Sequence, residues 1–169
     1  MIATAADSRS NAIRSCLAAG AVALLVVAAD QLTKHLARSG ITPGDEHRFL
    51  PGVELVNTRN RGVAFGFLPG SHVGVTILIA VALVVLLVYF ARHLDLPLIW
   101  LPTGMLIGGA LGNVIDRIRA GSVTDFIKLP LGWPPFNIAD ASITLGILAL
   151  VIVVDRARAH GASAEQTEP

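Results

Sequence analysis

The stretch VTDFIKLPLGWPPFNIADASITLGILALVIVV, residues 123–154, combines two aspartates with a long apolar run. Asp125 precedes the turn-rich segment PLGWPP, and Asp140 lies at the start of the apolar run. Ionisable groups at membrane depth are costly and are usually functional. Because proline and glycine favour turns, the chain between the two aspartates can fold back on itself. We therefore expect the two carboxyl groups to share one site.

The composition of the chain indicates a membrane protein. Of its 169 residues, 53% are hydrophobic, against roughly 45–50% in ordinary soluble domains. A helix that crosses a bilayer needs about 20 mostly apolar residues. We predict a mainly α-helical membrane protein with a single domain at 14–155, flanked by polar tails at 1–13 and 156–169. The four transmembrane helices are expected at approximately 15–34, 72–91, 96–116 and 137–155.

A different pattern occupies the segment between the first two predicted helices. Residues 41–70 contain β-branched and aromatic residues, broken by Pro51-Gly52 and Gly62, which predicts a small sheet on the membrane surface. The short connection RHLDLP, residues 92–97, makes the second and third helices antiparallel neighbours. In this interpretation, Asp125 lies in the longer loop between the third and fourth helices.

The two aspartates have both a structural and a chemical interpretation. Asn137 is placed to cap the fourth helix, and Asp140 in the first turn is favoured by the helix dipole. Two adjacent carboxyl groups do not both ionise readily, so one keeps its proton. The charged member can then accept a proton from an attacking water, while the protonated member polarises a peptide carbonyl. This is the arrangement of an aspartic peptidase, which requires no metal or other cofactor.

Glycine recurs on one face of the third predicted helix. Gly104, Gly108 and Gly112 follow one another at every fourth position. Small residues at this spacing let two helices approach closely inside a membrane. We therefore expect this face to pack against another helix.

Polar residues cluster at two predicted helix ends. Asn113, Asp116 and Arg117 share one helical face at i, i+3 and i+4, which predicts a hydrogen-bonded group that ties the third helix to its loop. Asp30 and Lys34 have the favourable acid-to-base order at i, i+4. An exposed pair of this kind contributes about 0.3–0.5 kcal/mol, and we expect it at the surface.

The segment NRGVAFGF, residues 60–67, has two interpretations. Asn60 and Gly62 can form a simple hairpin turn. Alternatively, their amide and backbone groups can bind an extended peptide.

Other functional classes are weakened by the residues present. A net charge of +1 without a basic stripe argues against a nucleic-acid partner. Ser122 and Lys128 are the best candidates for a serine–lysine peptidase, but both fall in a loop. The five histidines follow no HExxH pattern. A small transporter or proton channel remains the alternative, although such proteins place their carboxylates inside the spans.

Five sequence blocks together resemble one known family. The bacterial lipoprotein signal peptidases, also called signal peptidase II, contain similar blocks in the same order. The blocks in this chain are DQLTK (30–34), NRGVAFGF (60–67), GGALGNVIDR (108–117), VTDF (123–126) and FNIADASIT (136–144).

This resemblance implies a specific chemistry and site. Asp125 and Asp140 would be the catalytic dyad of a membrane aspartic endopeptidase. Its substrates would be prolipoproteins whose lipobox cysteine carries a diacylglyceryl group, cut just before that cysteine. The residues implied in substrate binding or dyad support are Asn60, Gly62, Asn113, Arg117, Asn137, Asp30, Lys34 and Asp116.

The resemblance also implies a location. The count of basic residues in the loops does not settle the orientation by the positive-inside rule. The family arrangement implies a multi-pass protein of the bacterial inner membrane, with both termini cytoplasmic and the dyad near the extracytoplasmic surface. Expected partners are prolipoprotein signal peptides and membrane lipid. A monomer and inhibition by cyclic peptides of the globomycin type are also expected.

Overall fold

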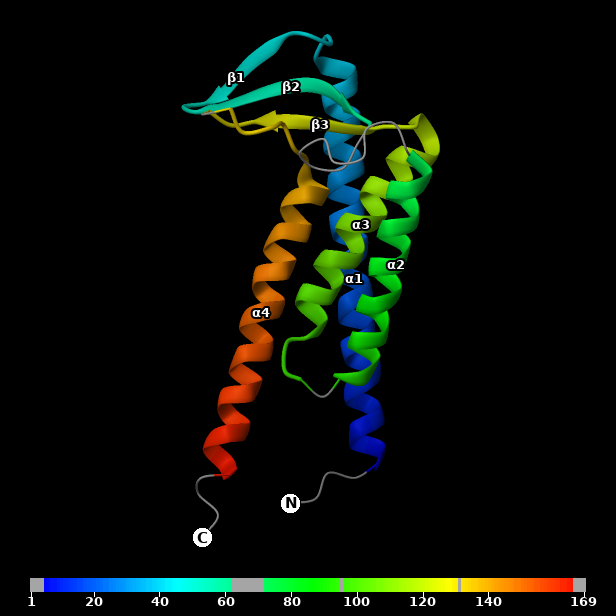
Figure 1. The fold of residues 1–169 in the computed structure, drawn as a ribbon, viewed down its shortest axis with the longest axis vertical. Helices are drawn as coiled ribbons and strands as arrows, with labels where there is room; N and C mark the ends of the chain where they lie inside the picture. Colours follow the sequence, from blue (N-terminus) through cyan, green and yellow to red (C-terminus); the bar gives the residue numbers. More distant parts are fainter. Residues whose placement is uncertain (1–4, 62–71, 95, 131, 166–169) are drawn as a thin grey trace.

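The computed structural model describes residues 5–61, 72–94, 96–130 and 132–165. Helices form a bundle and a sheet lies across one end of it, while the first and last described residues lie at the opposite end (Figure 1). The helices are α1 (Ala5–Gly40), α2 (His72–Arg92), α3 (Trp100–Ala120) and α4 (Ile138–Glu165). The strands are β1 (Glu46–Leu50), β2 (Val53–Asn60) and β3 (Val123–Lys128).

The first and last helices are longer than predicted. Helix α1 begins at Ala5 and α4 continues to Glu165, so much of each expected tail is helical. Hydropathy marks only the part of a helix that suits a bilayer. The polar ends of these helices are rich in alanine and arginine, which are strong helix formers.

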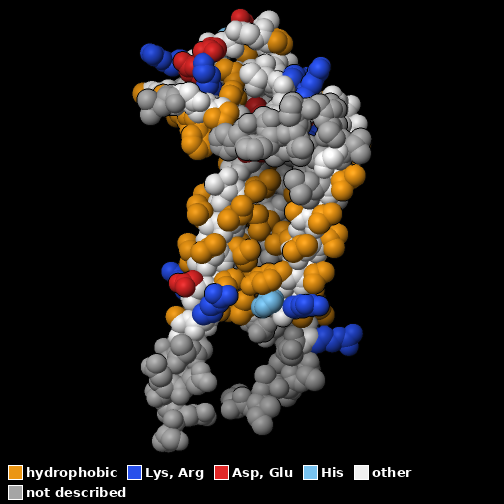
Figure 2. All heavy atoms as spheres, in the orientation of Figure 1, with side chains coloured by type: hydrophobic (Ala, Val, Ile, Leu, Met, Phe, Trp, Pro, Cys, Tyr) orange, Lys and Arg blue, Asp and Glu red, His pale blue; other side chains and the backbone are white. Residues whose placement is uncertain are grey.

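Large apolar side chains cover the outside of the bundle. Leu24 of α1 is 70% exposed, Val85 of α2 is 63% exposed and Val151 of α4 is 62% exposed. Figure 2 shows this apolar band between charged side chains at the two ends. Two segments, Arg9–Gly40 and Ile138–Ala159, are long and apolar enough to cross a membrane. Such a surface is suited to lipid rather than to water.

The glycines of α3 allow it to pack closely against α1, as predicted. A Cβ atom on Gly104 would lie 2.7 Å from the Cβ of Val22, and one on Gly108 would lie 2.7 Å from the Cβ of Val26. Gly109 makes a similar approach to α4, where a Cβ atom would lie 2.6 Å from the carbonyl oxygen of Ala139. Helix α3 is therefore held between α1 and α4.

The sheet contains a strand that the sequence interpretation placed in a loop. Helix α3 ends at Ala120 and is capped by Gly121, whose φ of 65° is left-handed and therefore favours glycine. The chain then enters β3, which pairs antiparallel with β2 and sets Asp125 opposite Thr58. Strands β1 and β2 confirm the predicted sheet in residues 41–70. The prediction that Asp125 lies in a loop is wrong, because strand pairing with a distant segment leaves little local signal.

The turn-rich segment folds back after β3, as predicted. The N–H of Phe136 donates to the carbonyl of Ile127 at 3.0 Å, and the N–H of Ile127 donates in return at 2.9 Å. This pairing brings the start of α4 beside β3. The next residue, Asn137, consequently reaches Asp125.

Candidate active site

Asp125 is a buried carboxyl on β3. It is 3% exposed, and both of its oxygens accept hydrogen bonds from asparagine side chains. Asn60 Nδ2 donates to Oδ2 at 3.0 Å and Asn137 Nδ2 donates to Oδ1 at 2.6 Å. Burial, followed by the negative charge of Asp140, raises the pKa of the Asp125 carboxyl to about 6. This carboxyl can therefore hold or release a proton near neutral pH.

Asp140 lies in the first turn of α4 and forms reciprocal hydrogen bonds with Asn137. The backbone N–H of Asp140 donates to Asn137 Oδ1 at 3.0 Å, and the backbone N–H of Asn137 donates to Asp140 Oδ2 at 3.3 Å. This pattern is a capping box, so the predicted cap is confirmed. Because Asn137 also donates to Asp125, one residue joins both acids. The remaining oxygen, Asp140 Oδ1, accepts from Asn113 Nδ2 at 2.8 Å.

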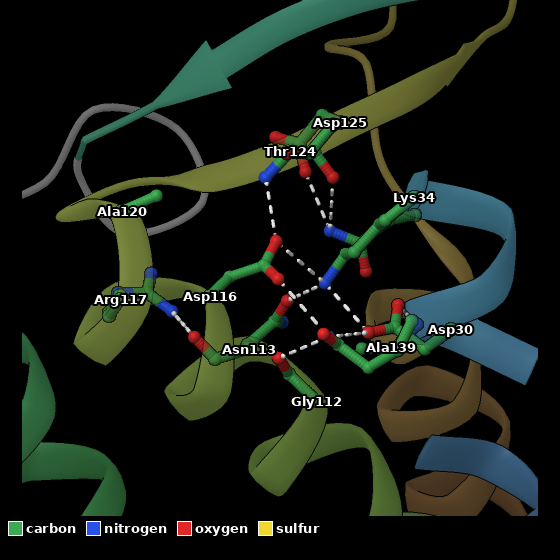
Figure 3. Close-up of polar contacts among 12 residues, drawn as sticks. Asp30, Lys34, Gly112, Asn113, Asp116, Arg117, Ala120, Thr124, Asp125 and Ala139 are labelled. Carbon is green, nitrogen blue, oxygen red and sulfur yellow. Dashed lines mark hydrogen bonds and ion pairs between the residues drawn. The ribbon is translucent and has the colours of Figure 1, made fainter. Parts of the chain in front are cut away.

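Lys34 is the centre of a buried ionic cluster beside the two acids (Figure 3). Its ammonium lies 2.8 Å from Asp30 Oδ2 and 3.4 Å from Asp116 Oδ2, and it donates to Asn113 Oδ1 at 3.0 Å. The side chains of Asp30 and Lys34 are 0% exposed. The prediction of a surface pair is therefore wrong, because α3 and α4 cover this face of α1.

The two acids of this cluster also connect separate elements. Asp30 Oδ1 accepts the backbone N–H of Ala139 at 2.9 Å, which joins α1 to the start of α4. Asp116 Oδ2 accepts the backbone N–H of Thr124 at 3.0 Å, which joins α3 to β3. The predicted tie between the end of α3 and the following segment is confirmed. Since Asp125 follows Thr124 and Asp140 follows Ala139, each tie holds the neighbour of one dyad acid.

Three residues of the cluster were missed by the sequence interpretation. Gln31 donates to Asp30 Oδ2 at 3.2 Å and to Asp116 Oδ1 at 3.1 Å. The side chain of Thr124 is fully buried and accepts from Arg38 at 3.2 Å, and Arg38 also lies 3.7 Å from Asp116. The only sequence signal for the first two is adjacency, because Gln31 lies inside DQLTK and Thr124 inside VTDF.

Four further residues were named in the sequence analysis: Arg117, Gly62, Ser122 and Lys128. Arg117 donates to the carbonyl of Asn113 one turn earlier, at 3.2 Å, and thus lies at the edge of the site. Gly62 lies outside the described residues. Ser122 donates to the carbonyl of Ala120, whereas Lys128 pairs with two glutamates of the sheet. These contacts give no support to a serine–lysine pair.

The arrangement suits acid–base chemistry. Two carboxyl groups from separate elements share Asn137, and amide donors orient all four of their oxygens. Within the described ranges, no three His, Cys, Asp or Glu side chains are grouped so that they could hold a metal ion. The fold and this site define a helical protein that holds a pair of carboxylic acids where its bundle meets its sheet.

The chain belongs to the signal peptidase II family. The family model described as "Signal peptidase (SPase) II" matches residues 22–155. The lipoprotein signal peptidase of Moorella thermoacetica is 41% identical over 136 residues, which cover 76% of this chain and 87% of that protein. That of Halothermothrix orenii is 37% identical over 132 residues, which cover 78% of this chain and 90% of that protein.

Solved structures support the same family fold. A bacterial membrane enzyme solved by the in meso method at 2.3 Å resolution superposes with a TM-score of 0.75 at 31% identity. That alignment covers 92% of this chain and 93% of the solved one. A second bacterial membrane enzyme, solved at 1.9 Å resolution, has a TM-score of 0.72 at 33% identity.

Proposed function

We propose that this protein is an aspartic endopeptidase that removes signal peptides from prolipoproteins. Its substrates would carry a diacylglyceryl group on the lipobox cysteine, and cleavage would occur just before that cysteine. Membership of the family supports the peptidase activity. The observation that carries the aspartic mechanism is the pairing of Asp125 and Asp140 through Asn137.

The mechanism requires the two acids to share one proton. The charged acid accepts a proton from a water molecule as the water oxygen attacks the peptide carbonyl carbon. The protonated acid hydrogen-bonds the carbonyl oxygen and stabilises its developing charge. It then supplies the proton that the departing amine needs, and the peptide bond breaks. The raised pKa of Asp125 supports a shared proton near neutral pH.

The supporting residues have separable roles in this proposal. Asn60 and Asn137 orient Asp125, while Asn113 and Asn137 orient Asp140. Asp30, Lys34 and Asp116 hold the elements that carry the acids. Arg117 and Gly62 would contact the substrate.

The proposed membrane arrangement has four spans in one domain, formed by the apolar parts of α1, α2, α3 and α4. Both termini would be cytoplasmic, and the sheet and dyad would lie near the extracytoplasmic surface of the inner membrane. The apolar band in Figure 2 supports this placement. The dyad lies at the sheet end of the helices, so the sheet would support the substrate at the interface, where water reaches the scissile bond. A monomer would suffice, and cyclic peptides of the globomycin type would compete with the substrate.

The direct test is cleavage of a diacylglyceryl-modified prolipoprotein by the purified protein. Wild type should release the signal peptide, whereas Asp125→Asn and Asp140→Asn should each lose at least about 10³-fold in rate, because each removes a group that handles the proton. Asp155→Asn is a matched control, since Asp155 is an exposed carboxylate near the other end of α4.

The outcomes separate the parts of the proposal. No cleavage by folded wild type would overturn the peptidase assignment. Retained cleavage in either dyad variant would remove that residue from the catalytic pair. A substrate with serine in place of the lipobox cysteine cannot be lipidated, and equal cleavage of it would contradict the proposed specificity.

A further inference from the structure

Lys34 makes one contact that charge balance does not require. A buried ammonium needs opposite charge and hydrogen-bond partners, and Asp30 and Asp116 supply the charge. The remaining contact, at 3.0 Å, is with the neutral side-chain oxygen of Asn113. That amide also faces Asp140, so the contact connects the ionic cluster to the dyad.

The chemistry of an ammonium group determines which way the Asn113 amide faces. A lysine ammonium has three N–H donors and no acceptor, so only the amide oxygen can turn toward it. The amide nitrogen must then point in the other direction, where it donates to Asp140 Oδ1 at 2.8 Å. An amide turned the other way would place its nitrogen against the Lys34 donors and its oxygen against the carboxylate.

We propose that Lys34 is a positioning residue for Asp140, which it orients through the side-chain amide of Asn113. This inference rests on the proposed peptidase function. Lys34 touches neither dyad acid in a direct hydrogen bond or ion pair among the contacts of the described residues. Its ammonium also acts on both dyad carboxyls through its charge, and the orienting effect proposed here is the part that passes through the amide.

Asn137, the asparagine that bonds both acids, provides a comparison. The side-chain oxygen of Asn137 accepts the backbone N–H of Asp140 at 3.0 Å, which turns its nitrogen toward Asp125. In Asn113 and Asn137 alike, the side-chain oxygen accepts from a group that can only donate, and the side-chain nitrogen donates to a dyad carboxyl. For Asn137 the donor is backbone and survives any side-chain substitution. For Asn113 the donor is Lys34, so this orientation can be tested by mutation.

The test replaces Lys34 without leaving an uncompensated charge. Lys34→Met combined with Asp30→Asn removes one positive and one negative charge, and asparagine keeps an oxygen for the N–H of Ala139. We expect kcat to fall on the order of 100-fold, as for loss of one preorganised donor. KM should change less than about threefold, because Lys34 contacts no substrate. Lys34→Gln in the same Asp30→Asn background retains a donor and should recover part of kcat.

Asn113→Ala shows whether the effect passes through the amide. If it does, adding Lys34→Met and Asp30→Asn to Asn113→Ala should cause little further loss in kcat. Fully multiplicative losses would overturn the proposal, because they would indicate that Lys34 acts by a route other than the Asn113 amide. Arg92→Met is the control, since Arg92 is an exposed basic residue in the last turn of α2 and lies outside the ionic cluster. This control should keep kcat within about threefold of wild type.

A second readout does not depend on activity. A neutron diffraction structure of the Lys34→Met, Asp30→Asn variant, which locates the amide hydrogens, should show that Asn113 Nδ2 no longer donates to Asp140 Oδ1. A retained hydrogen bond from this nitrogen would overturn the positioning role. If wild type cleaves no prolipoprotein, the proposed function fails, and this structure still decides whether Lys34 orients the amide.

Discussion

The four buried or partly buried aspartates at the sheet end have two different environments. Asp30 and Asp116 lie against the Lys34 ammonium, and Asp116 also lies 3.7 Å from the Arg38 guanidinium, so two basic groups compensate the two carboxylates. Asp125 and Asp140 instead accept hydrogen bonds from the amides of Asn60, Asn113 and Asn137. Amide donors orient a carboxyl group and supply no formal charge, so a proton can still move on and off. This difference separates the structural acids from the proposed catalytic acids.

The raised pKa of Asp125 predicts how stability depends on pH. Its ordinary pKa is 3.8, against about 6 in the folded protein. Between these values the folded state binds more protons than the unfolded state, so stability falls as pH rises from about 4 to about 6. Relative to Asp125→Asn, the wild type should lose on the order of 3 kcal/mol in free energy of unfolding across this range. Denaturant titrations in detergent micelles at several pH values would measure this difference.

The test compares how the free energy of unfolding varies with pH in wild type and in Asp125→Asn. Parallel pH dependence in wild type and Asp125→Asn would contradict a raised pKa at Asp125. If wild type instead became more stable relative to Asp125→Asn as pH rises, the folded state would favour the charged form of Asp125.

At the scale of elements, α3 holds the site together because its glycine face lies against α1. A Cβ atom on Gly112 would lie 2.6 Å from Asp30 Oδ2. That carboxylate is fully buried, and Lys34 and the N–H of Ala139 hold it in place. The close approach of α1 and α3 therefore determines where the ionic cluster sits, and through it the start of α4.

Gly112→Ala should destabilise the protein because the new methyl group has no free space. We expect a loss of about 1–3 kcal/mol in free energy of unfolding, as for overpacked interiors. Thermal unfolding in detergent micelles would measure it. Gly20→Ala is a matched control in α1, where a Cβ atom would meet nothing within 4 Å. Alanine also favours helix more than glycine does, so this control should be neutral or stabilising by up to about 1 kcal/mol. Equal stability of the two variants would contradict the close approach at Gly112.

At the scale of the whole molecule, the proposed active site lies at one end of the bundle. The sheet, the ionic cluster and the dyad all lie there, while α1 begins and α4 ends at the opposite end (Figure 1). Exposed apolar side chains cover the helices between these ends (Figure 2). The proposed orientation follows if the apolar band lies in the bilayer.

Cysteine labelling tests this orientation. Cys16 is exposed and is first replaced in Cys16→Ser. In that background, Asp45→Cys, beside the sheet, should react with a membrane-impermeant maleimide in intact spheroplasts. Arg158→Cys, near the end of α4, should react only after the membrane is permeabilised. The reverse pattern would invert the proposed topology, and labelling of both sites in intact spheroplasts would contradict an arrangement with the two ends on opposite sides.

The local sequence determined the features that depend on neighbouring residues. Apolar runs predicted helices, the glycine spacing predicted close packing, and Asn137 before Asp140 predicted a cap. Each signal lies within a few residues, because helical periodicity and capping are local properties. The turn residues between Asp125 and Asp140 likewise predicted that the chain folds back.

Only the tertiary structure decided the features that depend on distant segments. Burial of Asp30 and Lys34 follows from their cover by α3 and α4, and the placement of Asp125 on a strand follows from its pairing with β2. The roles of Gln31 and Lys34 likewise depend on residues of α3, far along the chain. The physical reason is that burial and hydrogen-bond partnership are properties of a pair of segments. The sequence of one segment does not specify which other segment will lie against it.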